Sequence, residues 1–131
     1  IETDEGRIEI DRAVFTEVDC SSDEGDIMLR DLRVEDMWLS ADEGDIIADY
    51  VPAGRGTVHM EVDEGDIEVY LPDNADLRVQ LQTYEGRIDS EFRIDMRRTD
   101  DDEEYAGGTI GKGTARLKAV SEEGDIFLYK R

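Results

Sequence analysis

The chain has 131 residues and carries 36 acidic against 15 basic side chains, which gives a formal net charge of −21 and an isoelectric point near 4.1. This charge excludes nucleic acid and anionic lipid as direct partners, because both are bound mainly through Lys and Arg. No stretch approaches the roughly 20 apolar residues of a membrane-spanning helix, so direct membrane insertion by this segment is excluded as well. The length fits one domain, and the single cysteine, Cys20, excludes an intramolecular disulfide bond and is expected to be a buried apolar side chain.

A glycine recurs along the chain at nearly constant spacing, as in the segment Asp23-Glu24-Gly25-Asp26-Ile27. The intervals between these glycines are 19, 19, 21, 21 and 38 residues. The last interval is twice 19. We therefore expect it to contain one additional repeat of normal length that lacks the glycine and isoleucine of the others. A fixed period of this size is typical of stacked-repeat folds. The turn glycines are Gly6, Gly25, Gly44, Gly65, Gly86 and Gly124, and each is followed two positions later by Ile8, Ile27, Ile46, Ile67, Ile88 or Ile126.

Each repeat is predicted to contain two strands that meet at its glycine. Before the glycine, mostly apolar residues alternate at the seventh, fifth and third positions back, for example at Val18, Cys20 and Ser22, which is the period of a strand with one buried face. After the glycine, the isoleucine is followed two residues later by another mostly apolar residue. Glycine at the turn between them can adopt positive φ at no steric cost.

These patterns predict an all-β fold, a single-stranded β-helix or β-solenoid of about six to seven rungs with roughly 19 to 21 residues in each. The alternative is an antiparallel β-sandwich or barrel. Repetition favours the solenoid, because stacked rungs place equivalent isoleucines on one another in an inward ladder about 4.8 Å apart.

We expect residues 1–131 to form a single β-solenoid domain that is a fragment of a longer chain. Ile1 stands five residues before the first glycine, where later repeats have inward strand residues, so a preceding strand is expected upstream. The segments Pro52–Gly56 and Leu71–Asp76 carry the two additional residues of the longer repeats, and they are predicted to lie at the far corner of the rung. Residues 91–116 are predicted to be an irregular loop and a modified last rung.

The repeated Gly-Asp-Ile segments, a glycine-rich stretch at 107–113 and a final Ser-Glu-Glu-Gly-Asp-Ile-Phe-Leu segment at 121–128 resemble the bacterial putative-adhesin domains of unknown function, of the auto-transporter adhesin type. The resemblance covers essentially the whole chain. It implies a β-solenoid in proteins of the bacterial cell envelope, and it carries over no catalytic residues. This sequence departs from the family in having glutamate before each turn glycine, where Ser or Thr is common.

Stacked rungs would place these glutamates, and the aspartates after the glycines, in acidic columns. Two explanations of the columns are open: adaptation to high salt, or binding of Ca²⁺, which prefers carboxylate oxygens. Most of this surface is expected to be simply solvated, and no other cofactor is predicted. The candidate Ca²⁺ ligands are Glu24, Glu43, Glu64, Asp26, Asp45 and Asp66.

Trp38 and His59 belong to the outward row of strand residues six positions before their glycines. Trp38 is expected to be partly covered by a neighbouring loop, or else to form an exposed binding surface for a sugar or a partner protein. His59 is expected to be a surface histidine, since a lone histidine supplies too few parts for a catalytic triad or a zinc site.

The sequence therefore predicts a non-enzymatic interaction module of a bacterial cell-envelope or surface protein, located outside the cytoplasm. Its expected partner is a protein or glycan at the cell surface, or a second copy. The alternative is a Ca²⁺-dependent β-helix protein that binds or acts on polysaccharide.

Overall fold

The computed structural model describes residues 2–98 and 103–130, with side chains for residues 6–95 and 103–130. The regular structure in these ranges is β-strand, as the sequence predicts. Among these residues no helix is long and apolar enough to cross a membrane. The strands are β1 (Glu2–Glu5), β2 (Ile8–Glu24), β3 (Ile27–Glu43), β4 (Ile46–Pro52), β5 (Thr57–Glu64), β6 (Ile67–Leu71), β7 (Leu77–Glu85), β8 (Ile88–Ser90), β9 (Asp95–Arg98), β10 (Glu104–Ile110), β11 (Ala115–Glu123) and β12 (Ile126–Lys130).

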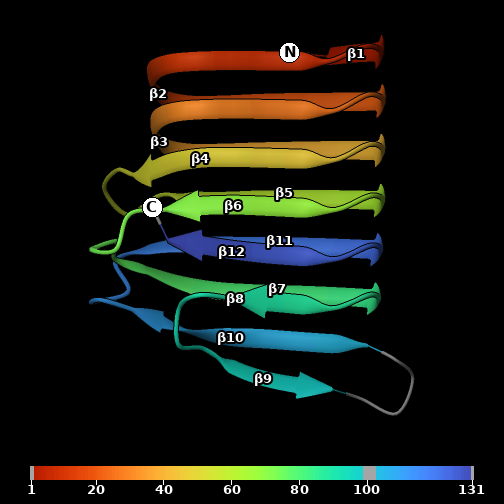
Figure 1. Cartoon of the computed structure of the whole chain (residues 1–131). Coiled ribbons are helices and arrows are strands. Elements are labelled where there is room, and N and C mark those ends of the chain that lie inside the picture. Colours follow the sequence, from red (N-terminus) through yellow and green to blue (C-terminus); the bar gives the residue numbers. More distant parts are fainter. Residues whose placement is uncertain (1, 99–102, 131) are drawn as a thin grey trace.

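The chain winds as a stack of rungs, in which the strands before and after each glycine lie in two layers (Figure 1). The strand after one glycine pairs in parallel with the strand after the next, and the strands before the glycines pair in the same way. Ile27, for example, is the register partner of both Ile8 and Ile46. Parallel pairing between successive rungs is the solenoid-like arrangement predicted from the repeats, whereas an antiparallel sandwich or barrel would pair them in opposite directions.

The far corner of each rung, opposite the glycine, differs between the early and the later repeats. β2 and β3 each run for 17 residues through this corner, where Arg12 and Asp31 adopt positive φ of 52° and 53°. In the longer repeats the strands end at the corner instead, β4 at Pro52 and β6 at Leu71. Proline has no N–H for the ladder, so strand pairing stops there.

The last rung of the sequence lies inside the stack, which the sequence reading did not predict. β11 pairs in parallel with β5 on one side and with β7 on the other, and β12 lies likewise between β6 and β8. Figure 1 shows this rung, in blue, between the rungs of β5 with β6 and of β7 with β8. The expectation that the 38-residue interval holds a parallel rung without a signature is wrong: the chain leaves the stack after β8 and returns to fill a gap between two earlier rungs.

Residues 91–116, predicted to be an irregular loop and a modified last rung, include two further strands. β10 pairs antiparallel with β7, and β9 pairs antiparallel with β10. They lie at the end of the stack farthest from β1 (Figure 1). This hairpin covers the edge of β7, which an open parallel stack would leave with unpaired backbone groups.

The glycine corners hold successive rungs in register. A Cβ atom on Gly44 would overlap the carbonyl group of Gly25, and the same overlap would arise for each later corner glycine against the carbonyl of its neighbour in the stack. The N–H of Gly25 donates to the Glu43 carbonyl at 2.9 Å, and the N–H of Ile27 donates to the Asp45 carbonyl at 2.9 Å. The corner contacts run in the order Gly6, Gly25, Gly44, Gly65, Gly124 and Gly86, which is the order of the rungs and not of the sequence.

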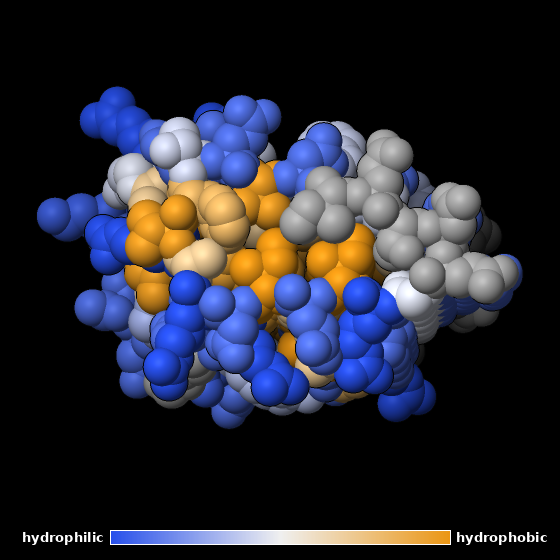
Figure 2. All heavy atoms as spheres, turned by 90° about the horizontal axis from the view of Figure 1, so that it is seen from above, coloured by the Kyte–Doolittle hydropathy of each residue, from blue (hydrophilic) through white to orange (hydrophobic). Residues whose placement is uncertain are grey.

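The core is the narrow space between the two layers. The isoleucines that follow the turn glycines form the predicted inward ladder, and none is more than 5% exposed. Cys20 is buried among them, as expected. Figure 2 looks onto the end of the stack and shows apolar side chains bordered by hydrophilic side chains on the outside.

Replacing Gly44 with Ala is expected to lower the free energy of unfolding by at least about 2 kcal/mol. The residue has φ of +144°, and the new methyl group would meet the Gly25 carbonyl. Gly107→Ala is the matched control, because a Cβ there meets only the Val79 carbonyl oxygen, at an ordinary 3.4 Å. Chemical denaturation at fixed salt measures both variants, and equal losses in the two would contradict the stacking role of the corner.

Candidate functional site

The outer face of β2, β3, β5, β11 and β7 carries two rows of outward side chains that cross the strands. Each row collects the residues at one distance before the corner glycine, because the parallel register aligns them. The row six residues before the glycines contains Asp19, Trp38, His59, Lys118 and Gln80, and the row eight residues before contains Glu17, Asp36, Thr57, Arg116 and Arg78. We call this surface the binding face.

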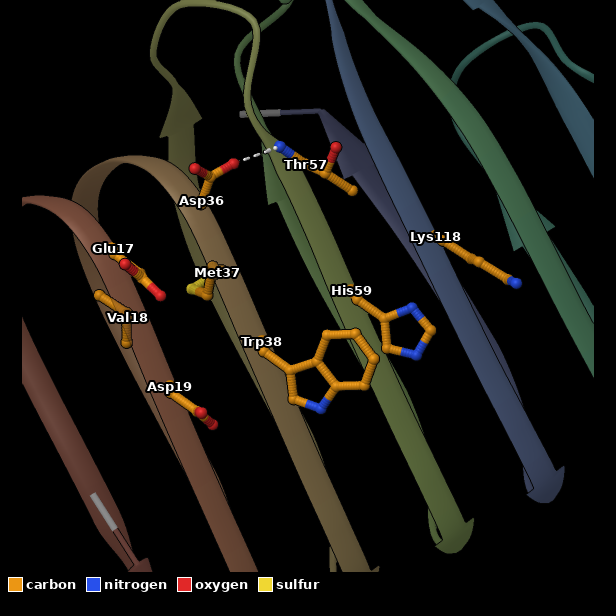
Figure 3. A pocket seen from close by; sticks show the side chains of 9 residues that line it. All are labelled: Glu17, Val18, Asp19, Asp36, Met37, Trp38, Thr57, His59 and Lys118. Carbon is orange, nitrogen blue, oxygen red and sulfur yellow. Dashed lines mark hydrogen bonds between the residues drawn. The ribbon is translucent and has the colours of Figure 1, made fainter.

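Trp38 and His59 form a stacked pair at the centre of the binding face. They are register partners on β3 and β5, and their ring centroids lie 4.0 Å apart with 16° between the ring planes. Figure 3 shows the two rings side by side, with Lys118 on the next strand beyond His59. Trp38 is 49% exposed, and the cover it has comes from the imidazole of a neighbouring strand rather than from the loop expected.

A hollow of about 310 Å³ surrounds this pair, and we call it the aromatic hollow. Its walls include Glu17, Asp19 and Asp36 on the side of β2 and β3, and Thr57 and Lys118 on the side of β5 and β11. The Asp36 carboxylate accepts a hydrogen bond from the Thr57 N–H at 2.9 Å, which fixes one wall (Figure 3). The hollow thus combines aromatic rings with hydrogen-bonding groups, a combination typical of ligand sites.

His59 lies on the outer face, and only 17% of its side chain is exposed. Burial lowers the pKa of its imidazole, Lys118 adds to this effect, and Glu61 opposes it. The Nε2 atom of His59 lies 3.7 Å from a Glu61 carboxylate oxygen. The ring is therefore neutral at neutral pH, which suits stacking on the indole.

A second hollow, of about 590 Å³, adjoins the first and shares Thr57 and Lys118 with it. We call it the basic hollow, because Arg78, Arg116 and Lys118 line it together with Gly108 and Thr109 of β10. Arg116 is the register partner of Arg78, and Lys118 stands opposite both His59 and Gln80. Sequence reasoning missed this cluster, because Arg78 and Arg116 come together only when β11 inserts between β5 and β7.

The aspartates proposed as calcium ligands accept hydrogen bonds from backbone N–H groups, which the sequence did not reveal. Asp26 accepts a hydrogen bond from the N–H of Asp45 at 2.9 Å, Asp45 accepts one from the N–H of Asp66 at 2.9 Å, and Asp66 accepts one from the N–H of Asp125 at 2.8 Å. Asp125 continues the ladder to the N–H of Arg87 at 2.8 Å. Each carboxylate supplies an acceptor to a backbone N–H of the next corner, where the glycine turn interrupts the strand ladder.

The glutamates Glu24, Glu43 and Glu64 are exposed and lie opposite one another on adjacent strands. Within residues 2–98 and 103–130, no group of three or more His, Cys, Asp or Glu side chains is arranged so that it could hold a metal ion. Calcium binding and salt adaptation both stay predictions for these columns.

The pKa of His59 is testable through Trp38, because Trp38 is the single tryptophan of the chain. We expect its fluorescence to change with a midpoint below pH 6.5, since burial and Lys118 disfavour the imidazolium. The unfolded chain takes up this proton at higher pH than the folded one, so the stability that the neutral ring contributes is lost as the pH falls below about 6.5.

His59→Gln is the control, and it should abolish the fluorescence transition. A midpoint at or above 6.5, or the same transition in His59→Gln, would contradict the stacked, neutral imidazole.

Comparison with known proteins adds a family and a fold. No curated protein matches the sequence. A solved structure of similar fold is that of a putative cell adhesion protein from Clostridium sporogenes, with a TM-score of 0.65 and 14% sequence identity. The similarity covers 89% of this chain and 56% of that one, so this chain spans little more than half the length of its structural neighbour.

The family of the chain follows from a match over nearly its whole length. The Toastrack DUF4097 family, whose function is unknown, matches residues 1–128. The resemblance noted from the sequence was also to a domain family of unknown function, so the two agree that the family has no assigned activity. The chain belongs to the Toastrack DUF4097 family.

Proposed function

We propose that this chain is a non-enzymatic binding module of a bacterial cell-surface or envelope protein, and that the binding face holds its ligand. The observation that carries the proposal is the Trp38–His59 stack, which presents a half-exposed indole in a hollow on a rigid parallel sheet. Aromatic side chains dominate contact energy at binding sites, and a sheet keeps them in place at little entropic cost.

The surroundings of the stack favour a sugar as the ligand. The apolar face of a sugar ring stacks on aromatic rings, and its hydroxyl groups donate to carboxylates such as Glu17 and Asp19 in the same hollow. The structural neighbour, described as a putative cell adhesion protein, supports a location at the cell surface. The single histidine of the chain packs on the indole of Trp38, and this supports a role in presenting a surface.

Trp38→Ala tests this proposal in a binding screen against neutral and acidic polysaccharides and envelope proteins. The variant is expected to lose affinity for the ligand by roughly tenfold or more, because the aromatic platform is removed. Tyr84→Ala is the matched control: Tyr84 is also exposed, at 39%, and lies on β7 outside both hollows. Equal binding by the wild type and Trp38→Ala would contradict the role of the stack.

A further inference from the structure

We propose that the basic hollow binds the carboxylate groups of an acidic polysaccharide, one in which uronate sugars alternate with uncharged sugars. This inference rests on the function proposed above and names its ligand class. The uronate would occupy the basic hollow, and the adjoining uncharged sugar would lie on Trp38 in the aromatic hollow.

The distribution of charge is the first observation. Only 15 basic residues stand against 36 acidic ones, yet Arg78, Arg116 and Lys118 gather in one hollow. Arg7 and Lys130, in contrast, each lie within 4.0 Å of an acid, Glu9 and Asp73. Among the described side chains, none lies within ion-pair distance of Arg78, Arg116 or Lys118. Three neighbouring exposed cations without protein counterions are open to an external anion.

The register places two of these exposed cations directly opposite each other. Arg116 and Arg78 are direct partners on adjacent parallel strands, and like charges directly opposite each other on a sheet destabilise it. In a chain so rich in acids, a single acidic residue at either position would remove the repulsion. A bound carboxylate would remove it as well, because the planar guanidinium group donates two parallel hydrogen bonds to a carboxylate.

The shape of the site favours a linked sugar over a small anion. The basic hollow has a volume of about 590 Å³, within the range of ligand pockets. It joins the aromatic hollow through Thr57 and Lys118. Trp38 and Arg116 stand two strands apart and in different rows of the binding face, so a short run of sugars in one chain can span both hollows.

The other end of the binding face restricts where the ligand can carry charge. Glu17, Asp19 and Asp36 line the aromatic hollow on the side away from the cations. A polyanion with a charge on every unit would meet these carboxylates, whereas an uncharged sugar would donate hydroxyl hydrogen bonds to them. The two halves of the binding face thus fit a polymer in which charged and uncharged sugars alternate.

Hyaluronan oligosaccharides, in which glucuronate alternates with an uncharged amino sugar, are a suitable probe. Their methyl esters, in which the carboxylates are uncharged, are the control ligand. We expect calorimetry at 0.15 M salt to show binding that weakens about tenfold or more on esterification. The double variant Arg78→Gln/Arg116→Gln should weaken binding of the acid by a similar factor or more. Its melting temperature should not fall, because the substitution removes a repulsion.

Arg30→Gln is the matched charge control, since Arg30 is exposed on the first half of β3, in the other layer of the stack. It should bind the oligosaccharide like the wild type. Three results would overturn the proposal: equal binding of acid and ester, full binding by the double variant, or the same loss in Arg30→Gln.

Two further results separate this inference from the function on which it rests. If Trp38→Ala weakens binding of acid and ester alike while Arg78→Gln/Arg116→Gln weakens neither, the module binds sugars and the basic hollow is not the carboxylate site. If sedimentation shows wild-type self-association that the double variant loses, the acidic end of a second copy occupies the hollow, and the proposal is overturned.

Discussion

The contact between each corner glycine and the glycine carbonyl of the neighbouring rung is the constraint on which the rest of the structure depends. No side chain fits between two corners, so the rungs approach to strand spacing and cannot slip along one another. Once the corners are aligned, every residue at a given distance from its glycine falls on one column. The isoleucine ladder inside, the aspartate ladder at the corner and the rows of the binding face all follow from this alignment.

The aspartate ladder shows how the fold accommodates part of its own acidity. A turn glycine interrupts strand pairing and leaves the next N–H without a strand acceptor. The carboxylate of the aspartate in the neighbouring rung accepts from that N–H, as Asp26 does from Asp45. An acidic column that looks like a metal site in the sequence is therefore also a set of backbone caps. The exposed glutamates of the neighbouring column have no such role, and their repulsion is reduced by salt in the solvent.

The sequence predicted those features that depend on distance from the glycine and missed those that depend on the order of rungs. The alternation around Met37 and Leu39 correctly placed Trp38 outward. A spacing pattern gives no information about which rung lies beside which, because parallel rungs of equal shape can stack in any order. The insertion of β11 between β5 and β7, and with it the meeting of Arg116 with Arg78, therefore could not be read from the intervals. The stacking of Trp38 on His59 could have been predicted from the sequence, because both residues occupy the same position in successive repeats.

The inserted rung is the claim on which the basic hollow depends, and inter-strand nuclear Overhauser effects between backbone protons test it most directly. The structure predicts contacts from Leu117 of β11 to Val58 of β5 on one side and to Val79 of β7 on the other. Direct contacts between Val58 and Val79, with β11 at the end of the stack, would contradict this rung order and separate Arg116 from the neighbours that the binding face requires.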